Sequence, residues 1–167
     1  MSLSKYSDQE MLPEDKYLQI PPDGFIFRRM MEYGLEERGV AKAFLRCTEN
    51  IDKRFRPLWI GYRAMSSLLM SIHETGNSEK VKCFNEGKYL LEFAINKNPQ
   101  NAELRLIRLV AQSNLSKDMN YYSEMEEDQN FLKNFCEKKL RSSFDKELQA
   151  LIRKYETDKC FNKNQLA

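Results

Sequence analysis

The sequence is poor in the residues that interrupt helices. It has 6 glycines and 5 prolines among 167 residues, which is few for an all-β or loop-rich protein, because turns use both residue types. Leucine, lysine, glutamate, methionine and arginine are plentiful, and these side chains lose little freedom on entering a helix. The composition therefore predicts an all-α fold, and the length suits a single domain with its own hydrophobic core.

The chain also lacks the side chains that metal sites and nucleophilic catalysts usually need. His73 is the single histidine, whereas zinc sites and catalytic triads place histidine beside fixed partners. The cysteines are far apart, at positions 47, 83, 136 and 160, and form no Cys-x-x-Cys pair. The acidic run at 124–128 lacks the alternating oxygen ligands and the glycine of a calcium loop. We therefore expect no catalytic activity, no metal and no cofactor.

Long apolar runs and an excess of one charge are missing as well. Runs such as Leu68-Leu69-Met70 are far shorter than the roughly 20 residues of a membrane helix. Charged residues make up 31% of the chain, yet the formal net charge is only +2, so no general attraction for nucleic acid or anionic lipid is expected. Because residues 1–24 hold no signal-peptide core, we expect a cytoplasmic protein, unless a native leader precedes the given residues.

The pattern of apolar and helix-stopping residues predicts about seven helices. The clearest boundary is the turn at 98–101, because proline cannot continue a helix and Asn101 can cap the next one. The expected helices, in chain order, are a short one from Phe25 to Gly34, one within 35–50, one starting at Pro57, one capped by Ser78, one after Pro99, one capped by Ser123, and one from Ser142 or Ser143 to about Glu156.

Helical spacing also predicts which residues face inward. The expected inner positions include Val40, Phe44 and Cys47 on the second helix and Val81, Phe84, Leu91 and Ile95 on the fourth. The helix after Pro99 is apolar around much of its girth, so we expect it to be the most buried. Residues 25–157 would then form one helical-hairpin domain, after an extended or partly disordered lead-in at 1–24 and before a polar tail at 158–167.

Part of the chain resembles tetratricopeptide repeats. The stretch from Ala94 to Pro99, with a new helix starting at Ala102, resembles the end of one repeat and the start of the next, and the resemblance covers residues 57–115. A regular repeat lasts about 34 residues, but the link between Ala64 and Gly87 is too long. The resemblance therefore implies an irregular, TPR-like stack of antiparallel helical hairpins.

A second resemblance covers the whole chain from about Phe25. It rests on Gly61-Tyr62-Arg63 and on the segment Glu103-Leu104-Arg105-Leu106-Ile107-Arg108-Leu109. These residues resemble a family of small bacterial proteins with no established activity. The resemblance therefore implies a bacterial source, and it implies no reaction or ligand.

Arg105, Arg108 and Gln112 share one face of the expected fifth helix. Because that helix is otherwise apolar, the arginines need partners, and an internal salt-bridge network with Glu103, Glu127 or Asp128 would supply them. The alternative is a groove in which the arginines hold a carboxylate or an acidic peptide through bidentate bonds. Tyr62, Arg63, Tyr121 and Tyr122 would complete such a groove.

These observations lead to one preferred function and two alternatives. We expect a protein-protein interaction or adaptor module that receives a protein or peptide partner, acidic in character, on the surface of stacked hairpins. The first alternative is a ligand-binding protein or enzyme that holds an anionic molecule between helices, using the same arginines, Gln112 and Tyr62. The second is RNA binding through the short cluster Lys53-Arg54-Phe55-Arg56, which the balanced charge makes the weaker one.

Overall fold

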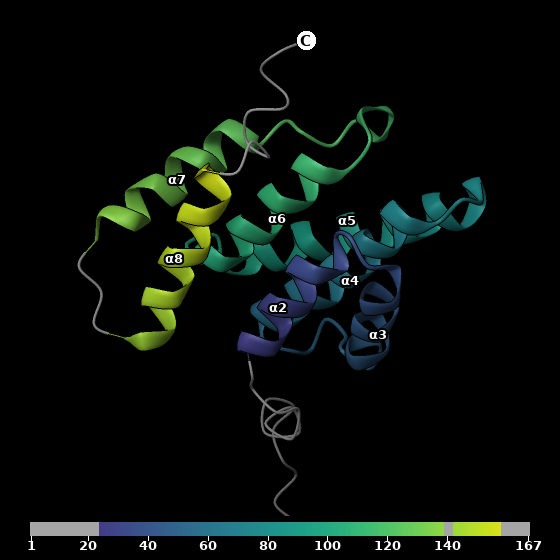
Figure 1. The fold of residues 1–167 in the computed structure, drawn as a ribbon, viewed down its shortest axis with the longest axis horizontal. Helices are drawn as coiled ribbons and strands as arrows, with labels where there is room; N and C mark the ends of the chain where they lie inside the picture. Colours follow the sequence, from purple (N-terminus) through teal and green to yellow (C-terminus); the bar gives the residue numbers. More distant parts are fainter. Residues whose placement is uncertain (1–23, 139–141, 158–167) are drawn as a thin grey trace, which may run out of the picture.

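The computed structural model describes residues 24–138 and 142–157, and the regular structure of these residues is entirely helical (Figure 1). It consists of α2 (Gly24–Gly34), α3 (Arg38–Thr48), α4 (Pro57–His73), α5 (Asn77–Lys97), α6 (Ala102–Asn114), the short 3-10 helix η2 (Lys117–Met119), α7 (Met125–Glu137) and α8 (Ser143–Thr157). The predicted all-α fold is confirmed, and the seven α-helices of the described residues match the expected number. The antiparallel, TPR-like stacking of hairpins stays a prediction.

Two further expectations concern the ends of the chain and membrane-spanning helices. The predicted lead-in and the predicted polar tail lie outside the described residues, apart from Gly24, which is the first residue of α2. Among the described helices, none has the length and apolar character needed to cross a membrane.

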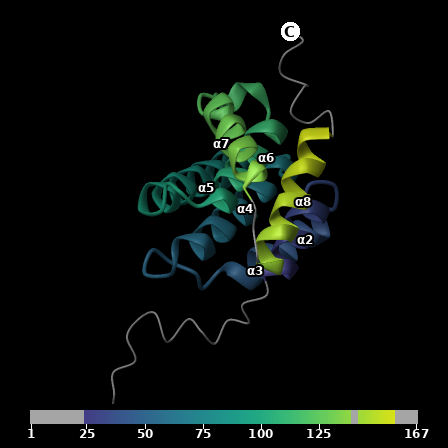
Figure 2. The same cartoon turned by 90° about the vertical axis from the view of Figure 1, so that its left-hand side faces the viewer.

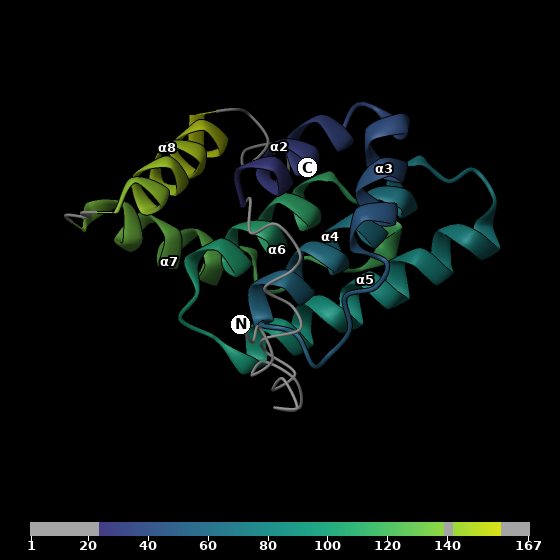
Figure 3. The same cartoon turned by 90° about the horizontal axis from the view of Figure 1, so that it is seen from below.

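Helix α4 lies in the middle of the arrangement. It packs against α2, α3, α5 and α6, and Figure 3 shows it between these helices. Helices α7 and α8 lie together on the other side of α6 from α3, in green and yellow in Figure 1. Figure 2 shows α8 beside α2, where Lys154 of α8 forms an ion pair with Glu32 at 2.6 Å.

An aromatic cluster joins α2, α3 and α4. The Phe27 ring lies 5.4 Å from Phe44, 5.5 Å from Trp59 and 5.1 Å from Tyr62, measured between centroids. Rings at these distances, tilted or edge to face, add to the stabilisation that burial provides. A hydrogen bond outside this cluster joins the end of α4 to the end of α2: Nε2 of His73 lies 2.7 Å from the carbonyl oxygen of Gly34.

The predicted caps hold at one helix and fail at two. Asn101 caps α6 as expected, since its side chain accepts a 3.0 Å hydrogen bond from the Leu104 amide. Ser78 does not cap α5, because the helix begins one residue before it and Gly76 is the N-cap residue. Ser123 does not cap α7 either: its hydroxyl donates to the side chain of the N-cap residue, Glu124.

The predicted inner faces need two corrections, while α6 is the most buried helix, as expected. Cys47 is exposed, because the buried line on α3 runs through Ala41, Phe44 and Thr48 and passes beside it. Val81 is 46% exposed. On α5 the buried positions are Phe84, Gly87, Leu91, Ala94 and Ile95. The error at Cys47 is a displacement of one residue, about 100° around the helix, because its neighbour Thr48 is buried. Val81 lies in the first turns of α5, before the buried positions begin at Phe84.

Helices α4 and α5 approach each other closely at Gly87. A Cβ atom there would lie 2.8 Å from the Ala64 carbonyl oxygen and 2.6 Å from Cγ of Leu68. Since the carbonyl belongs to the backbone of α4, it cannot turn aside as a side chain can.

We expect Gly87→Ala to lower the free energy of unfolding by about 1 to 3 kcal/mol, because overpacking outweighs the better helix propensity of alanine. Gly39→Ala on α3 is the matched control, since a Cβ there meets no atom within 4 Å. Its stability should stay unchanged or rise by up to about 1 kcal/mol. Urea unfolding followed by circular dichroism measures both, and equal stability of the two variants would contradict the close approach.

Candidate functional site

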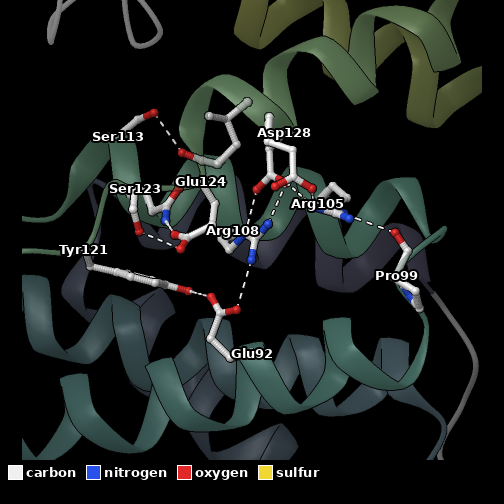
Figure 4. Close-up of polar contacts among 12 residues, drawn as sticks. Glu92, Pro99, Arg105, Arg108, Ser113, Tyr121, Ser123, Glu124 and Asp128 are labelled. Carbon is white, nitrogen blue, oxygen red and sulfur yellow. Dashed lines mark hydrogen bonds and ion pairs between the residues drawn. The ribbon is translucent and has the colours of Figure 1, made fainter.

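Two arginines of α6 share one buried carboxylate of α7. Asp128 is fully buried, and its Oδ2 accepts from Nε of Arg108 at 2.7 Å while its Oδ1 accepts from Nη2 at 2.8 Å. Arg105 donates to the same Oδ1 from Nη1 at 2.9 Å (Figure 4). Paired, charge-assisted hydrogen bonds of this kind are among the stronger polar contacts in proteins.

Further acceptors satisfy the remaining guanidinium groups. Glu92 of α5 accepts from Nη1 of Arg108 at 2.9 Å, and it also accepts from the hydroxyl of Tyr121. Arg105 donates to Glu127 at 2.8 Å and to the Pro99 carbonyl at 3.1 Å. The network therefore connects α5, α6, α7 and the two loops that flank α6.

Burial and charge act in opposite directions on Arg108. Burial alone would lower the pKa of its guanidinium, but the hydrogen bond and the charge of Asp128 outweigh burial and raise the pKa above its ordinary value. The pKa of Tyr121 is raised by burial and by the charge of Glu92. At neutral pH Arg108 is therefore a cation and Tyr121 a neutral donor.

This arrangement is the internal salt-bridge network that the sequence left as one of two interpretations. Arg105 and Arg108 are both buried, and their charges face protein carboxylates. The expectation that Glu103 could be a partner is wrong, because Glu103 lies on another side of α6. There it accepts from Nε and Nη2 of Arg28, at 2.7 and 2.9 Å.

The other two predicted site residues do not join the network. Tyr62 donates its hydroxyl to Glu103, beside Arg28, and burial together with that carboxylate raises its pKa well above the ordinary value. Arg63 pairs with Glu86 and Ser67 between α4 and α5. The structure therefore brings Arg105 and Arg108 onto one carboxylate, while Gln112 pairs with Glu124 further along α6. Tyr62 and Arg63 lie apart from all three.

Gln112 lies about one turn beyond Arg108 on α6, and its hydrogen bond is separate from those of the network. Its Nε2 donates to Oε2 of Glu124 at 3.0 Å, whereas its Oε1 is buried without a hydrogen-bond partner among the described residues. The side chain borders a hollow of about 380 Å³. We call it the α6–α7 hollow, and it is lined by Gln112, Leu115, Ser116, Lys117, Tyr121, Tyr122 and Met125.

A second surface combines aromatic rings with lysines. On α5, Tyr89 is 56% exposed and Phe93 is half-buried. The ammonium of Lys53, from the loop after α3, donates to the Tyr89 hydroxyl. It lies 4.1 Å from the Tyr89 ring centroid and 5.2 Å from that of Phe93. Lys97 lies 5.6 Å from the Phe93 centroid. We call these four residues the α5 basic–aromatic face.

Sequence reasoning found one part of this face and missed the rest. Lys53 belongs to the basic cluster considered for RNA, but Phe55 of that cluster is buried and Arg54 pairs with Asp52. Tyr89 and Phe93 are four residues apart and so lie on one side of a helix, which was a usable signal. Nothing in the sequence indicates that the 49–56 loop brings Lys53 to these rings.

The comparisons add no family to these observations. The chain matches no protein-family model, no curated protein and no solved structure. The resemblance to tetratricopeptide repeats therefore stays a prediction. In the described part of the chain, no group of three or more His, Cys, Asp or Glu side chains is placed to hold a metal ion.

Asp128→Asn should destabilise the protein by about 3 to 5 kcal/mol, because two buried guanidinium groups lose their shared counter-charge. Glu127→Gln removes an acid that also pairs with Arg105, but the Glu127 side chain is 67% exposed, so its effect should stay below about 1 kcal/mol. Chemical unfolding at neutral pH compares the two variants. A small effect of Asp128→Asn would show that the carboxylate is not needed to hold α7 on α6.

The carboxyl group of Glu124 gives a test by pH. Burial tends to raise its pKa, but hydrogen bonds from Ser123 and Gln112 hold the pKa below the ordinary value of 4.5. Because the folded-state pKa is depressed, Glu124 stabilises the fold above its unfolded pKa, and this contribution is lost as the pH falls through the folded value. NMR titration of the carboxyl carbon should give a midpoint below 4.5, and Gln112→Leu should raise it; a midpoint unmoved by that change would contradict the hydrogen bond.

Proposed function

We propose that this chain is a non-catalytic protein-interaction module, and that its α5 basic–aromatic face binds an acidic peptide segment of a partner protein. The observation that carries the proposal is the position of Lys53, whose exposed ammonium donates to the Tyr89 hydroxyl and lies near the Tyr89 and Phe93 rings. Within residues 24–138 and 142–157, neither Lys53 nor Lys97 forms an ion pair with a carboxylate.

The chemistry of this face suits a peptide that combines acids with apolar side chains. Two ammonium groups attract carboxylates, while the exposed Tyr89 ring and the half-buried Phe93 ring offer apolar area. Aromatic residues are enriched in protein interfaces for this reason. The TPR-like pattern supports the same class of function, since stacked helical hairpins present extended surfaces for peptides.

The face supports a peptide better than it supports RNA or an anion at the α6 arginines. The shallow depression beside Lys53 has mixed charge, because Glu49, Asp52 and Glu86 border it together with Lys53, Arg54 and Arg63. Such a surface suits a peptide with a few acids among apolar residues better than a phosphate backbone, which carries a negative charge at every nucleotide. Arg105 and Arg108 are buried and engaged by protein acids. An anion there would have to displace Asp128 or Glu92.

We expect short random peptides selected by display on the intact chain to be enriched in Asp and Glu beside apolar residues. A fluorescein-labelled selected peptide should bind more tightly than the same peptide with Gln and Asn in place of its acids, and its affinity should fall with rising salt. In Lys53→Glu/Lys97→Glu, fluorescence anisotropy should show binding weakened by about tenfold or more.

The matched control is Lys42→Glu/Lys146→Glu, which makes the same charge change at exposed positions of α3 and α8. It should leave the affinity within about a factor of two, apart from the general effect of net charge. Selection of neutral or basic peptides, or equal binding by both double variants, would overturn the proposal. Tighter binding of labelled oligouridylate than of any selected peptide would favour RNA instead.

A further inference from the structure

We propose that the α6–α7 hollow is a binding site for a small, flat, mainly apolar molecule that presents one neutral N–H donor, and that Oε1 of Gln112 accepts this donor. The hollow is a different surface from the α5 basic–aromatic face, so this inference does not depend on the function proposed above. It rests on an unsatisfied buried acceptor, on the lining of the hollow and on the charges around it.

The orientation of the Gln112 amide is fixed by its neighbour. An ionised carboxylate can only accept, so the amide nitrogen must face Glu124, as it does at 3.0 Å. The carbonyl oxygen then lies at the opposite edge of the planar amide group, away from Glu124. Flipping the amide would bring two acceptors together, so the assignment of oxygen and nitrogen follows from the chemistry of Glu124.

The Gln112 oxygen lacks a hydrogen bond, whereas the neighbouring polar side chains of α6 have one. Gln112 is 3% exposed, and a buried acceptor without a donor destabilises a folded protein. The neighbouring polar side chains of α6 are satisfied: Ser113 donates to the Leu109 carbonyl at 2.7 Å, and Asn114 donates to the Val110 carbonyl at 2.8 Å. Gln112 lines the hollow, but its Oε1 has almost no exposed surface, so a donor in the hollow reaches this oxygen only when a covering side chain moves aside. A few polar groups that orient a mainly apolar ligand are a feature of ligand sites.

The size and lining of the hollow define the body of the ligand. Its volume of about 380 Å³ lies in the lower part of the range of roughly 300 to 1,000 Å³ that small-molecule pockets occupy. Leu115, Met125 and Tyr122 supply apolar and aromatic walls. A flat ring can pack against such side chains, and thioether–aromatic contacts are favourable as well.

The surrounding charges favour a neutral donor over a cation. Lys117 lines the hollow, and its ammonium repels a ligand ammonium. The Glu124 carboxylate already accepts from Ser123 and Gln112, so it is not free to pair with a bound cation. It does polarise the Gln112 amide, because an amide that donates to an anion becomes a better acceptor at its carbonyl.

The test uses indole and 1-methylindole, which share a flat apolar body and differ in the N–H donor. In NMR titrations of the intact chain, indole should shift the signals of Gln112, Leu115 and Met125. 1-Methylindole should bind about tenfold more weakly. This comparison is made on the wild-type protein, so it does not depend on whether a variant folds.

The variant Gln112→Met tests whether the preference for indole over 1-methylindole comes from the Gln112 oxygen. It keeps the length and most of the volume of the side chain but removes the acceptor, so both probes should bind equally. Gln100→Met, at an exposed position in the turn before α6, should keep the wild-type preference. Equal binding of the two probes to the wild-type protein, or shifts that spare the hollow, would overturn the assignment.

Discussion

The carboxylate of Asp128 is the interaction on which the arrangement around α6 depends. It is fully buried and accepts hydrogen bonds from both Arg105 and Arg108. Desolvating two guanidinium groups is costly, and their attraction to a single carboxylate offsets that cost only when the geometry is good and the remaining donors are satisfied. Glu92, Glu127 and the Pro99 carbonyl satisfy other donors of the pair.

Helix α6 is buried on nearly all sides, and its polar side chains specify its neighbours. Glu103 accepts hydrogen bonds from Arg28 of α2 and Tyr62 of α4. Arg105 and Arg108 form ion pairs with Asp128 of α7. An apolar surface of similar shape would bury as much area but would tolerate a rotated helix, since hydrophobic contact is not directional. We infer that these pairs fix the rotation and position of α6, at some cost in stability.

The sequence predicted the helices well because their signals are local. Proline at position 57, the Asn-Pro turn at 98–99 and the Asn101 cap each act within one helical turn. It predicted that the α6 arginines need acidic partners, because an unpaired buried charge is excluded on energetic grounds alone. The sequence wrongly offered Glu103 as a partner of these arginines. Glu103 pairs instead with Arg28, which is 75 residues away along the chain. The Lys53 contact with α5 and the unsatisfied Gln112 oxygen were missed for the same reason: each depends on how distant segments pack.

Glu92 lies close to both candidate surfaces. It precedes Phe93 of the α5 basic–aromatic face, and it also holds Arg108 of the network and Tyr121 of the α6–α7 hollow. Glu92 therefore contacts the network and one wall of the hollow directly, and it adjoins the other surface only along the chain. A turn of α5 about its axis would carry the Glu92 carboxylate away from the Tyr121 hydroxyl and release one wall of the hollow.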